Sequence, residues 1–178
     1  GVQRAQGFPA FHRLNLQPAW GLRHDEFMRP VHDVPTIRAA EAALMAQTPE
    51  GALMQRAATG LAATTASLMR ETFGRVTGLR LAVVAGSGNN GGDALFAASQ
   101  LARRGVSVDI LPTSDTLHPE GLRAAQREGA RIRAPRRADV VLDAVVGIGG
   151  VGPLRPAAAQ IRDVVDAELT LAVALPSG

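Results

Sequence analysis

One segment in the middle of the chain constrains its fold more than any other. The apolar run Leu81–Ala85 leads into residues 86–93, which read Gly-Ser-Gly-Asn-Asn-Gly-Gly-Asp. Such a run predicts a β-strand that is buried on both faces. A helical pattern follows over Asp93–Arg104, so the glycines match G-x-G-x-x-G between a strand and a helix, the context that this fingerprint requires. Glycines let the main chain approach a phosphate, and a helix N-terminus supplies N–H donors. A tight turn from strand to helix is the alternative.

Strand and helix patterns alternate along the rest of the chain. Further strands are predicted over Val106–Leu111, Asp139–Val146 and Leu169–Leu175, and helices over Thr36–Gln47, Thr48–Phe73, Pro119–Glu128 and Pro156–Asp166. Thr48 is expected to cap the second of these helices, with Pro49 at its first position. The alternation predicts an α/β protein with a parallel sheet and helices on both of its faces.

Three special segments follow predicted strands, at the edge where open parallel sheets bind ligands. They are residues 86–93, Gly147–Pro153 and Pro176–Gly178. Asp143 comes just before the second segment, where a carboxylate can ligate a cation or orient a polar ligand. Ser177 offers a hydroxyl in the third. Solvated turn residues are the alternative for both.

Other polar residues are weaker candidates. Asp109 lies 23 residues after Gly86 and could imitate the ribose-binding acid of a dinucleotide fold. Four histidines lack metal-ligand spacing and are interpreted as surface or loop residues, and four arginines are interpreted as a solvated edge. These residues are His12, His24, His32 and His118, and Arg131, Arg133, Arg136 and Arg137.

Composition narrows the class of protein. The chain has 178 residues, a size that suits one globular domain. It has no Cys, which excludes disulfides and thiolate zinc sites. All 19 basic residues are Arg, so Schiff-base lysine chemistry is excluded within these residues. A formal net charge of +3 is weak support for nucleic-acid binding. No stretch approaches the ~20 apolar residues of a membrane span, and we expect a cytoplasmic protein.

Four segments together resemble one known family. Gly88–Asp93 is similar to the G-N-N-G-G-D-G segment of the NAD(P)H-hydrate epimerases, which are also called YjeF N-terminal domains. Asp143–Gly149 resembles their D-A-hydrophobic-hydrophobic-G-x-G segment, Val173–Gly178 their V-D-I-P-S-G segment, and Leu53–Ala57 their L-M-x-R-A helix. Residues 1–27 show no sustained periodicity and are interpreted as an irregular N-terminal extension. The resemblance predicts an epimerase-like domain over residues 28–178, incomplete at its C-terminus.

The resemblance implies a Rossmann-like three-layer α/β/α sandwich with a mostly parallel central sheet, in a homodimer. The implied activity is epimerisation of the R and S forms of hydrated NAD(P)H, called NADHX and NADPHX, in the repair of nicotinamide cofactors. An ADP- or ATP-dependent dehydratase, fused or separate, would act next. A potassium ion is implied in the site.

The resemblance also assigns site residues. Substrate contacts fall on Asn89, Asn90, Gly91, Gly92 and Asp93, and on Gly147, Ile148, Gly149, Gly150, Val151, Gly152 and Pro153. Potassium ligands fall on Asn90, Asp143 and Ser177.

Two departures from the family pattern leave other functions open. Ala174 stands where the family has an aspartate that contacts substrate, and a methyl group cannot transfer a proton. The catalytic residue is therefore unknown. The sequence also stops at Gly178, where family members continue. A non-catalytic nucleotide- or protein-binding module on the same fold is the alternative function, and an NAD-dependent oxidoreductase is the third.

Overall fold

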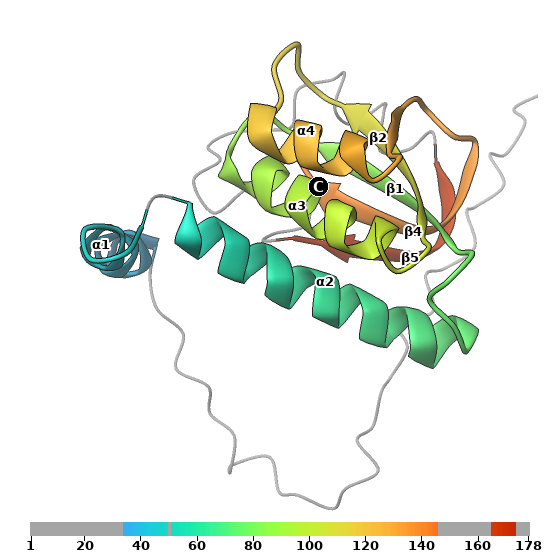
Figure 1. Cartoon of the computed structure of the whole chain (residues 1–178), viewed down its shortest axis with the longest axis horizontal. Helices are drawn as coiled ribbons and strands as arrows, with labels where there is room; N and C mark the ends of the chain where they lie inside the picture. Colours follow the sequence, from blue (N-terminus) through green and yellow to red (C-terminus); the bar gives the residue numbers. More distant parts are fainter. Residues whose placement is uncertain (1–33, 50, 146–164, 174–178) are drawn as a thin grey trace, which may run out of the picture. The chain divides into compact units, whose positions relative to one another are not determined.

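A computed structural model describes residues 34–49, 51–145 and 165–173 (Figure 1). These residues contain four helices and five strands. The elements are α1 (Val34–Met45), α2 (Ala52–Phe73), β1 (Arg80–Ala85), α3 (Asn89–Ala102), β2 (Ser107–Pro112), α4 (Pro119–Arg127), β3 (Arg131–Ile132), β4 (Arg137–Ala144) and β5 (Asp166–Ala172). Among the described residues, no helix is both long and apolar enough to cross a membrane.

The strands form one sheet in the order β3-β2-β1-β4-β5, and all neighbouring strands are parallel. The central strand β1 is buried on both faces, as its apolar run predicts. Leu81 and Val83 belong to one apolar cluster, and Ala82 and Val84 belong to another. The predicted α/β class with a parallel sheet is confirmed.

Three helices form a layer on one face of this sheet. The middle helix, α3, packs against β1, and α2 and α4 pack on either side of it (Figure 1). Most of the buried residues of α2 and α3 are small. The full set of buried residues is Ala58, Ala62, Thr65, Ala66 and Met69 on α2, and Gly91, Gly92, Ala94, Leu95, Ala97, Ala98, Ser99 and Leu101 on α3.

The helix predicted over Pro156–Asp166 falls mainly outside the described residues. Its predicted end is wrong, because Asp166 is the first residue of β5. The strands β4 and β5 both begin earlier in the sequence than predicted, and both end earlier.

The start of α2 also differs from the prediction. The helix begins at Ala52 after Gly51, which adopts a left-handed conformation with φ 77°. Thr48 and Pro49 lie before the helix, so the predicted cap at Thr48 is wrong. The Thr48 hydroxyl instead donates to the carbonyl of Leu44 at 2.6 Å. Short hydroxyl side chains often form such local hydrogen bonds with the main chain, and this bond competes with capping of α2.

The sequence pattern missed one strand. β3 has only two residues, both exposed, and pairs with the middle of β2 through Asp109↔Arg131 and Ile110↔Ile132. Two residues are too few to show an alternation of apolar and polar side chains, so pairing with β2 defines this strand.

Candidate functional site

Main-chain hydrogen bonds join the carboxyl ends of four neighbouring strands. The amide of Gly86, just after β1, donates to the carbonyl of Ala144 in β4 at 3.1 Å. The amide of Val173, just after β5, donates to the main-chain carbonyl of Asp143 at 2.9 Å. The amide of Thr113, just after β2, donates to the main-chain carbonyl of Ala85 at 3.0 Å. The segments after these strands therefore begin at one edge of the sheet, where open parallel sheets bind ligands.

The helix α3 begins at Asn89, four residues before the predicted start at Asp93. Gly88 is the extended N-cap residue, with φ −86° and ψ −173°, and its carbonyl accepts from the amide of Gly92 at 3.1 Å. The segment Asn89–Asp93 is thus the first turn of the helix and not a loop. The positive end of the α3 dipole lies at the carboxyl edge of the sheet, an arrangement that favours anions.

Close contact between main-chain segments explains two of the glycines. A Cβ at Gly91 would overlap the carbonyl oxygen of Gly86, and a Cβ at Gly86 would lie 2.6 Å from the carbonyl oxygen of Val145. No residue with a side chain fits at either position without moving the main chain. The first turn of α3 therefore lies against the loop after β1, and this loop lies against the end of β4.

Asp143 is a buried carboxylate at this edge. It is the second-last residue of β4, paired in register with Val84 of β1 and Ala172 of β5. It is only 3% exposed, and its Oδ1 accepts from the amide of Val145 at 3.3 Å. Ala144 and Val145, the two residues after Asp143, lie against Gly86, and Gly86 lies against Gly91 in the first turn of α3. The same turn carries the half-buried Asn90.

The remaining predicted site residues lie outside the described part of the chain. These are Gly147–Pro153, Ala174 and Ser177.

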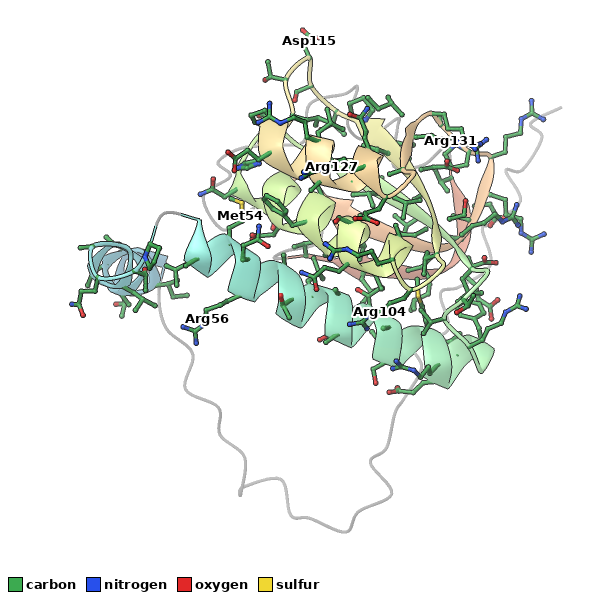
Figure 2. All side chains as sticks on the ribbon, viewed as in Figure 1. Met54, Arg56, Arg104, Asp115, Arg127 and Arg131 are labelled. Carbon is green, nitrogen blue, oxygen red and sulfur yellow. The ribbon has the colours of Figure 1, made fainter. Side chains whose placement is uncertain are left out.

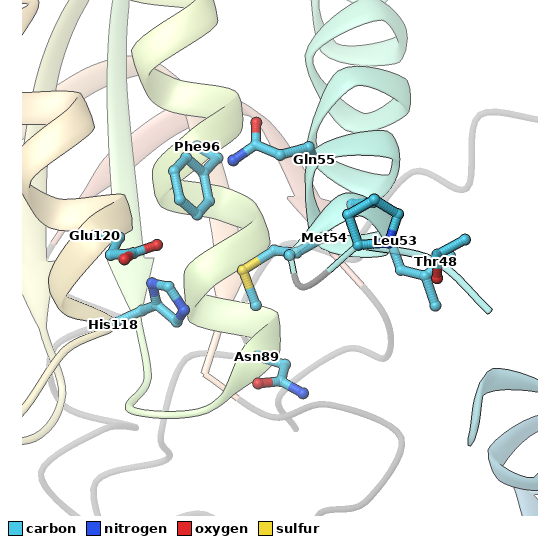
Figure 3. A pocket seen from close by; sticks show the side chains of 11 residues that line it. Thr48, Leu53, Met54, Gln55, Asn89, Phe96, His118 and Glu120 are labelled. Carbon is cyan, nitrogen blue, oxygen red and sulfur yellow. The ribbon is translucent and has the colours of Figure 1, made fainter. Parts of the chain in front are cut away.

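A pocket that sequence reasoning missed opens beside the first turn of α3. It has a volume of about 670 Å³, and the segment from Thr48 into α2 lines it together with residues of α3 and α4 (Figure 3). Six lining residues matter below. They are Met54 and Gln55 of α2, Asn89 and Phe96 of α3, and His118 and Glu120 at the start of α4. Met54 projects from α2 toward α3, whereas Arg56 projects away from it (Figure 2).

His118 lies in the loop before α4, which agrees with its interpretation as a surface or loop histidine, and it is also half-buried in the wall of the pocket. It is the N-cap of α4, and its Nδ1 accepts from the amide of Gly121 at 3.1 Å. Its ring meets Phe96 edge-on, with the ring centres 5.6 Å apart and the planes at 63°. Its place before Pro119 at a predicted helix start was the one sequence signal for this cap.

Asp109 does not occupy the position of a ribose-binding acid. It lies in the middle of β2, and its buried carboxylate binds Arg133, with Nε and Oδ1 2.5 Å apart. The hydrogen bond and the charge of Asp109 both raise the pKa of the Arg133 guanidinium above its usual range. Arg133 is exposed, as its interpretation as part of a solvated arginine edge predicts, and it is in addition an ion-pair partner. Arg131, Arg136 and Arg137 are also exposed, as predicted.

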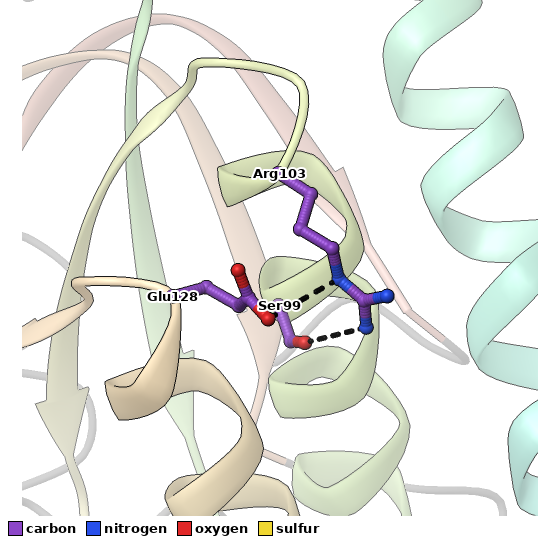
Figure 4. A network of polar contacts seen from close by, with 3 residues as sticks. All are labelled: Ser99, Arg103 and Glu128. Carbon is purple, nitrogen blue, oxygen red and sulfur yellow. Dashed lines mark hydrogen bonds and ion pairs between the residues drawn. The ribbon is translucent and has the colours of Figure 1, made fainter.

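A second polar contact ties the far ends of α3 and α4 together. Arg103 lies 3.4 Å from Glu128 and also donates to the Ser99 hydroxyl at 3.4 Å (Figure 4). Arg103 is largely exposed, so this pair contributes little to stability. It lies at the opposite end of α3 from the pocket. Within the described part of the chain, no group of three or more His, Cys, Asp or Glu side chains could hold a metal ion.

The fold and the site define an α/β domain with a parallel sheet. At the carboxyl ends of its strands lie a buried carboxylate and the N-terminus of a helix whose first turn contains two glycines. The family model described as YjeF-related protein N-terminus matches residues 50–178, and the chain belongs to this family.

Curated relatives agree with this assignment. The chain is 48% identical over 156 residues to the bifunctional NAD(P)H-hydrate repair enzyme Nnr of Mycobacterium tuberculosis, with 85% of this chain and 33% of the relative covered. It is 38% identical over 155 residues to the NAD(P)H-hydrate epimerase of Microbacterium testaceum, with 80% of this chain and 58% of that protein covered. The chain thus spans a third to somewhat over half of the length of these relatives.

The fold also matches a solved structure. The crystal structure of the yeast protein ynu0, YNL200c, superposes with a TM-score of 0.64 at 18% sequence identity, with 84% of this chain and 72% of that chain covered. At this low identity the match supports the α/β fold.

Proposed function

We propose that this chain catalyses the epimerisation of the R and S forms of NADHX and NADPHX. The observation that carries the proposal is that Gly86 lies against both the Asn89–Asp93 turn and the end of the strand that holds Asp143, because both of these segments carry the motifs that resemble the epimerases. The relative from Microbacterium testaceum bears the name of this activity.

The substrate would bind along the carboxyl edge of the sheet. Asn89–Asp93 would supply main-chain N–H groups and amide side chains to the diphosphate, since a helix N-terminus stabilises negative charge. Residues 147–153 would line the other side of the substrate. Both sets follow strands that are neighbours in the sheet, so one dinucleotide could touch both.

Potassium would be held by Asn90, Asp143 and Ser177. These residues offer an amide, a carboxylate and a hydroxyl oxygen, and oxygen ligands of this kind suit a hard cation. The Asp143 carboxylate is only 3% exposed and belongs to the carboxyl end of β4, where it would meet an ion bound at this edge of the sheet. The ion would supply positive charge beside the substrate phosphates.

We also propose the following assignments for the whole protein. The epimerase-like domain spans residues 28–178, forms a homodimer and works in the cytoplasm. A dehydratase, fused or separate, would take up the S form, as the bifunctional names of relatives suggest.

The test is conversion of purified (R)-NADHX to the S epimer, followed by chromatography with and without the chain. Conversion above the spontaneous rate supports the proposal. Arg56→Ala is the control variant, and its conversion rate should equal that of the natural chain, because this exposed side chain points away from the pocket.

The Ala174→Asp variant separates two explanations of a negative result. If only this variant is active, the pocket is competent and the missing carboxylate limits the natural chain. If neither chain exceeds background, the epimerase proposal is wrong and a non-catalytic binding module becomes the leading function.

A further inference from the structure

The imidazole of His118 is held in one orientation and one tautomer. Its Nδ1 accepts the Gly121 N–H, so in the neutral ring the proton lies on Nε2. A bond that fixes one ring nitrogen in this way leaves the other as a defined donor. Nε2 has no hydrogen-bond partner among the described residues, and the ring extends from the start of α4 toward Met54 (Figure 3).

Two glycines make the space that this ring occupies. A Cβ at Gly92 would lie 3.0 Å from both Cγ and Cδ2 of His118, and 3.1 Å from the terminal methyl carbon of Met54. A Cβ at Gly121 would lie 3.5 Å from Nδ1 of the imidazole and 3.0 Å from the Cβ of Leu95. With Phe96 on a further side, the ring has little freedom to tilt, which suits a group that must present a donor at a fixed place.

The pocket around His118 has the character of a binding site for a planar heterocycle. Phe96 and the thioether of Met54 provide an apolar wall of the kind that packs on flat rings. The amides of Gln55 and Asn89 add a few polar groups, as is usual for small-molecule sites. Glu120 lines the same pocket, and its negative charge disfavours a phosphate there.

The pocket is continuous with the proposed phosphate site. Asn89 lines the pocket and also begins the predicted substrate segment Asn89–Asp93. A dinucleotide with its diphosphate at the start of α3 therefore has one heterocycle within reach of His118.

We propose that His118 is a substrate-binding residue, whose Nε2–H donates to an acceptor on the edge of one heterocycle of the dinucleotide held beside Met54 and Phe96. This inference rests on the proposed function for the identity of the ligand. Both the adenine and the hydrated nicotinamide carry acceptors on their edges, and the experiment distinguishes them.

Two substitutions separate binding from helix capping. His118→Asn keeps an oxygen that can accept the Gly121 amide, because Asn is a good N-cap, but it removes the donor at the Nε2 position. His118→Gln reaches the Nε2 position with an amide N–H and loses the cap geometry. The measurements are kcat and KM for NADHX, the melting temperature, and calorimetric binding of adenosine monophosphate and of nicotinamide mononucleotide to the full chain.

We expect His118→Asn to keep the melting temperature and kcat and to raise KM about 3- to 10-fold, the effect of one lost neutral hydrogen bond. His118→Gln should melt lower but keep a KM nearer to that of the natural chain. The mononucleotide whose affinity falls in the Asn variant identifies the bound heterocycle.

The inference is overturned if His118→Asn binds both mononucleotides and NADHX as tightly as the natural chain, or if losses in affinity simply follow losses in melting temperature. It is also overturned if neither mononucleotide binds the natural chain and KM does not respond. Failure of the proposed function looks different: the natural chain then gives no turnover, while a weakened mononucleotide affinity in the Asn variant still supports the role of His118 in binding.

Discussion

Gly91 of α3 lies directly against the carbonyl oxygen of Gly86, so two segments of main chain touch where a helix begins and a strand ends. Gly91→Ala would force the first turn of α3 away from the sheet. We expect a loss of about 1–3 kcal/mol in the free energy of unfolding, typical of overpacking, together with a loss of substrate binding. Thermal unfolding and NADHX turnover measure the two effects.

Gly60→Ala is the matched control for that substitution. Gly60 lies inside α2, and a Cβ there would meet nothing within 4 Å. Alanine is the better helix former, so this variant should gain about 0.5–1 kcal/mol. If Gly91→Ala proved as stable as Gly60→Ala, the contact with Gly86 would not be a real constraint.

Gly92→Ala should affect binding more than stability. Its new methyl group would press on a side chain, the His118 imidazole, and not on main chain. We expect a smaller loss of stability than for Gly91→Ala, and a rise in KM similar to that of His118→Asn. The check is to measure KM for Gly92→Ala, for His118→Asn and for the variant that carries both changes. Two changes that disturb one contact should not have additive effects on KM. Fully additive effects on KM would contradict the prediction.

Asp143→Asn should remove a dependence on potassium. If this buried carboxylate helps to hold the cation, the natural chain melts higher and turns over faster in potassium than in tetramethylammonium at equal ionic strength. The Asn variant keeps a similar shape but not the charge, so its melting temperature and turnover should respond little to the choice of salt. Equal responses of the two chains would show that Asp143 is not a ligand.

Arg133→Gln should destabilise the fold without altering the pocket. It leaves the buried Asp109 carboxylate without its cation, and unpaired buried charge is costly. Arg131→Gln, at an exposed position on the short strand β3 just before Arg133, is the control. Denaturant unfolding of both variants, and of Asp109→Asn combined with Arg133→Gln, would test whether the pair is the cause. The double variant should recover part of the loss.

The contribution of this pair should be constant through neutral pH. Asp109 raises the pKa of Arg133, so on the Arg133 side the added stability is fully present below the ordinary pKa of arginine. It is lost only as the pH rises through the still higher pKa of the folded state. A decline in the difference between the natural chain and Arg133→Gln between neutral and mildly alkaline pH would contradict this assignment.

The strand–glycine–helix unit was predictable because its signal is local. Burial of β1 on both faces follows from its unbroken apolar run, and the parallel sheet follows from the alternation of elements. The start of α3 was misplaced because Gly91 and Gly92 have low helix propensity and favour a loop. Contacts with Gly86 and His118, which lie outside the helix, explain why glycines occupy its first turn.

The pocket could not be predicted for a different reason. Met54, Asn89 and His118 are far apart in the sequence, and only the packing of α2, α3 and α4 brings them together. Asp109 shows the reverse error: its spacing from the glycines fits a ribose ligand, but the register of β2 places it in mid-strand beside Arg133. Spacing alone does not say at which end of a strand a residue lies.

The alanines buried between α2 and α3 have a consequence for ligand binding. Ala58, Ala62 and Ala66 have no rotamers, so the distance between these helices depends on the main chain and not on side chains that could rearrange. The walls carrying Met54 and Phe96 are therefore spaced before any ligand arrives, and little conformational entropy should be lost on binding. Such a frame also lets the lining side chains vary independently, so ligand preference can change while the helices keep their places.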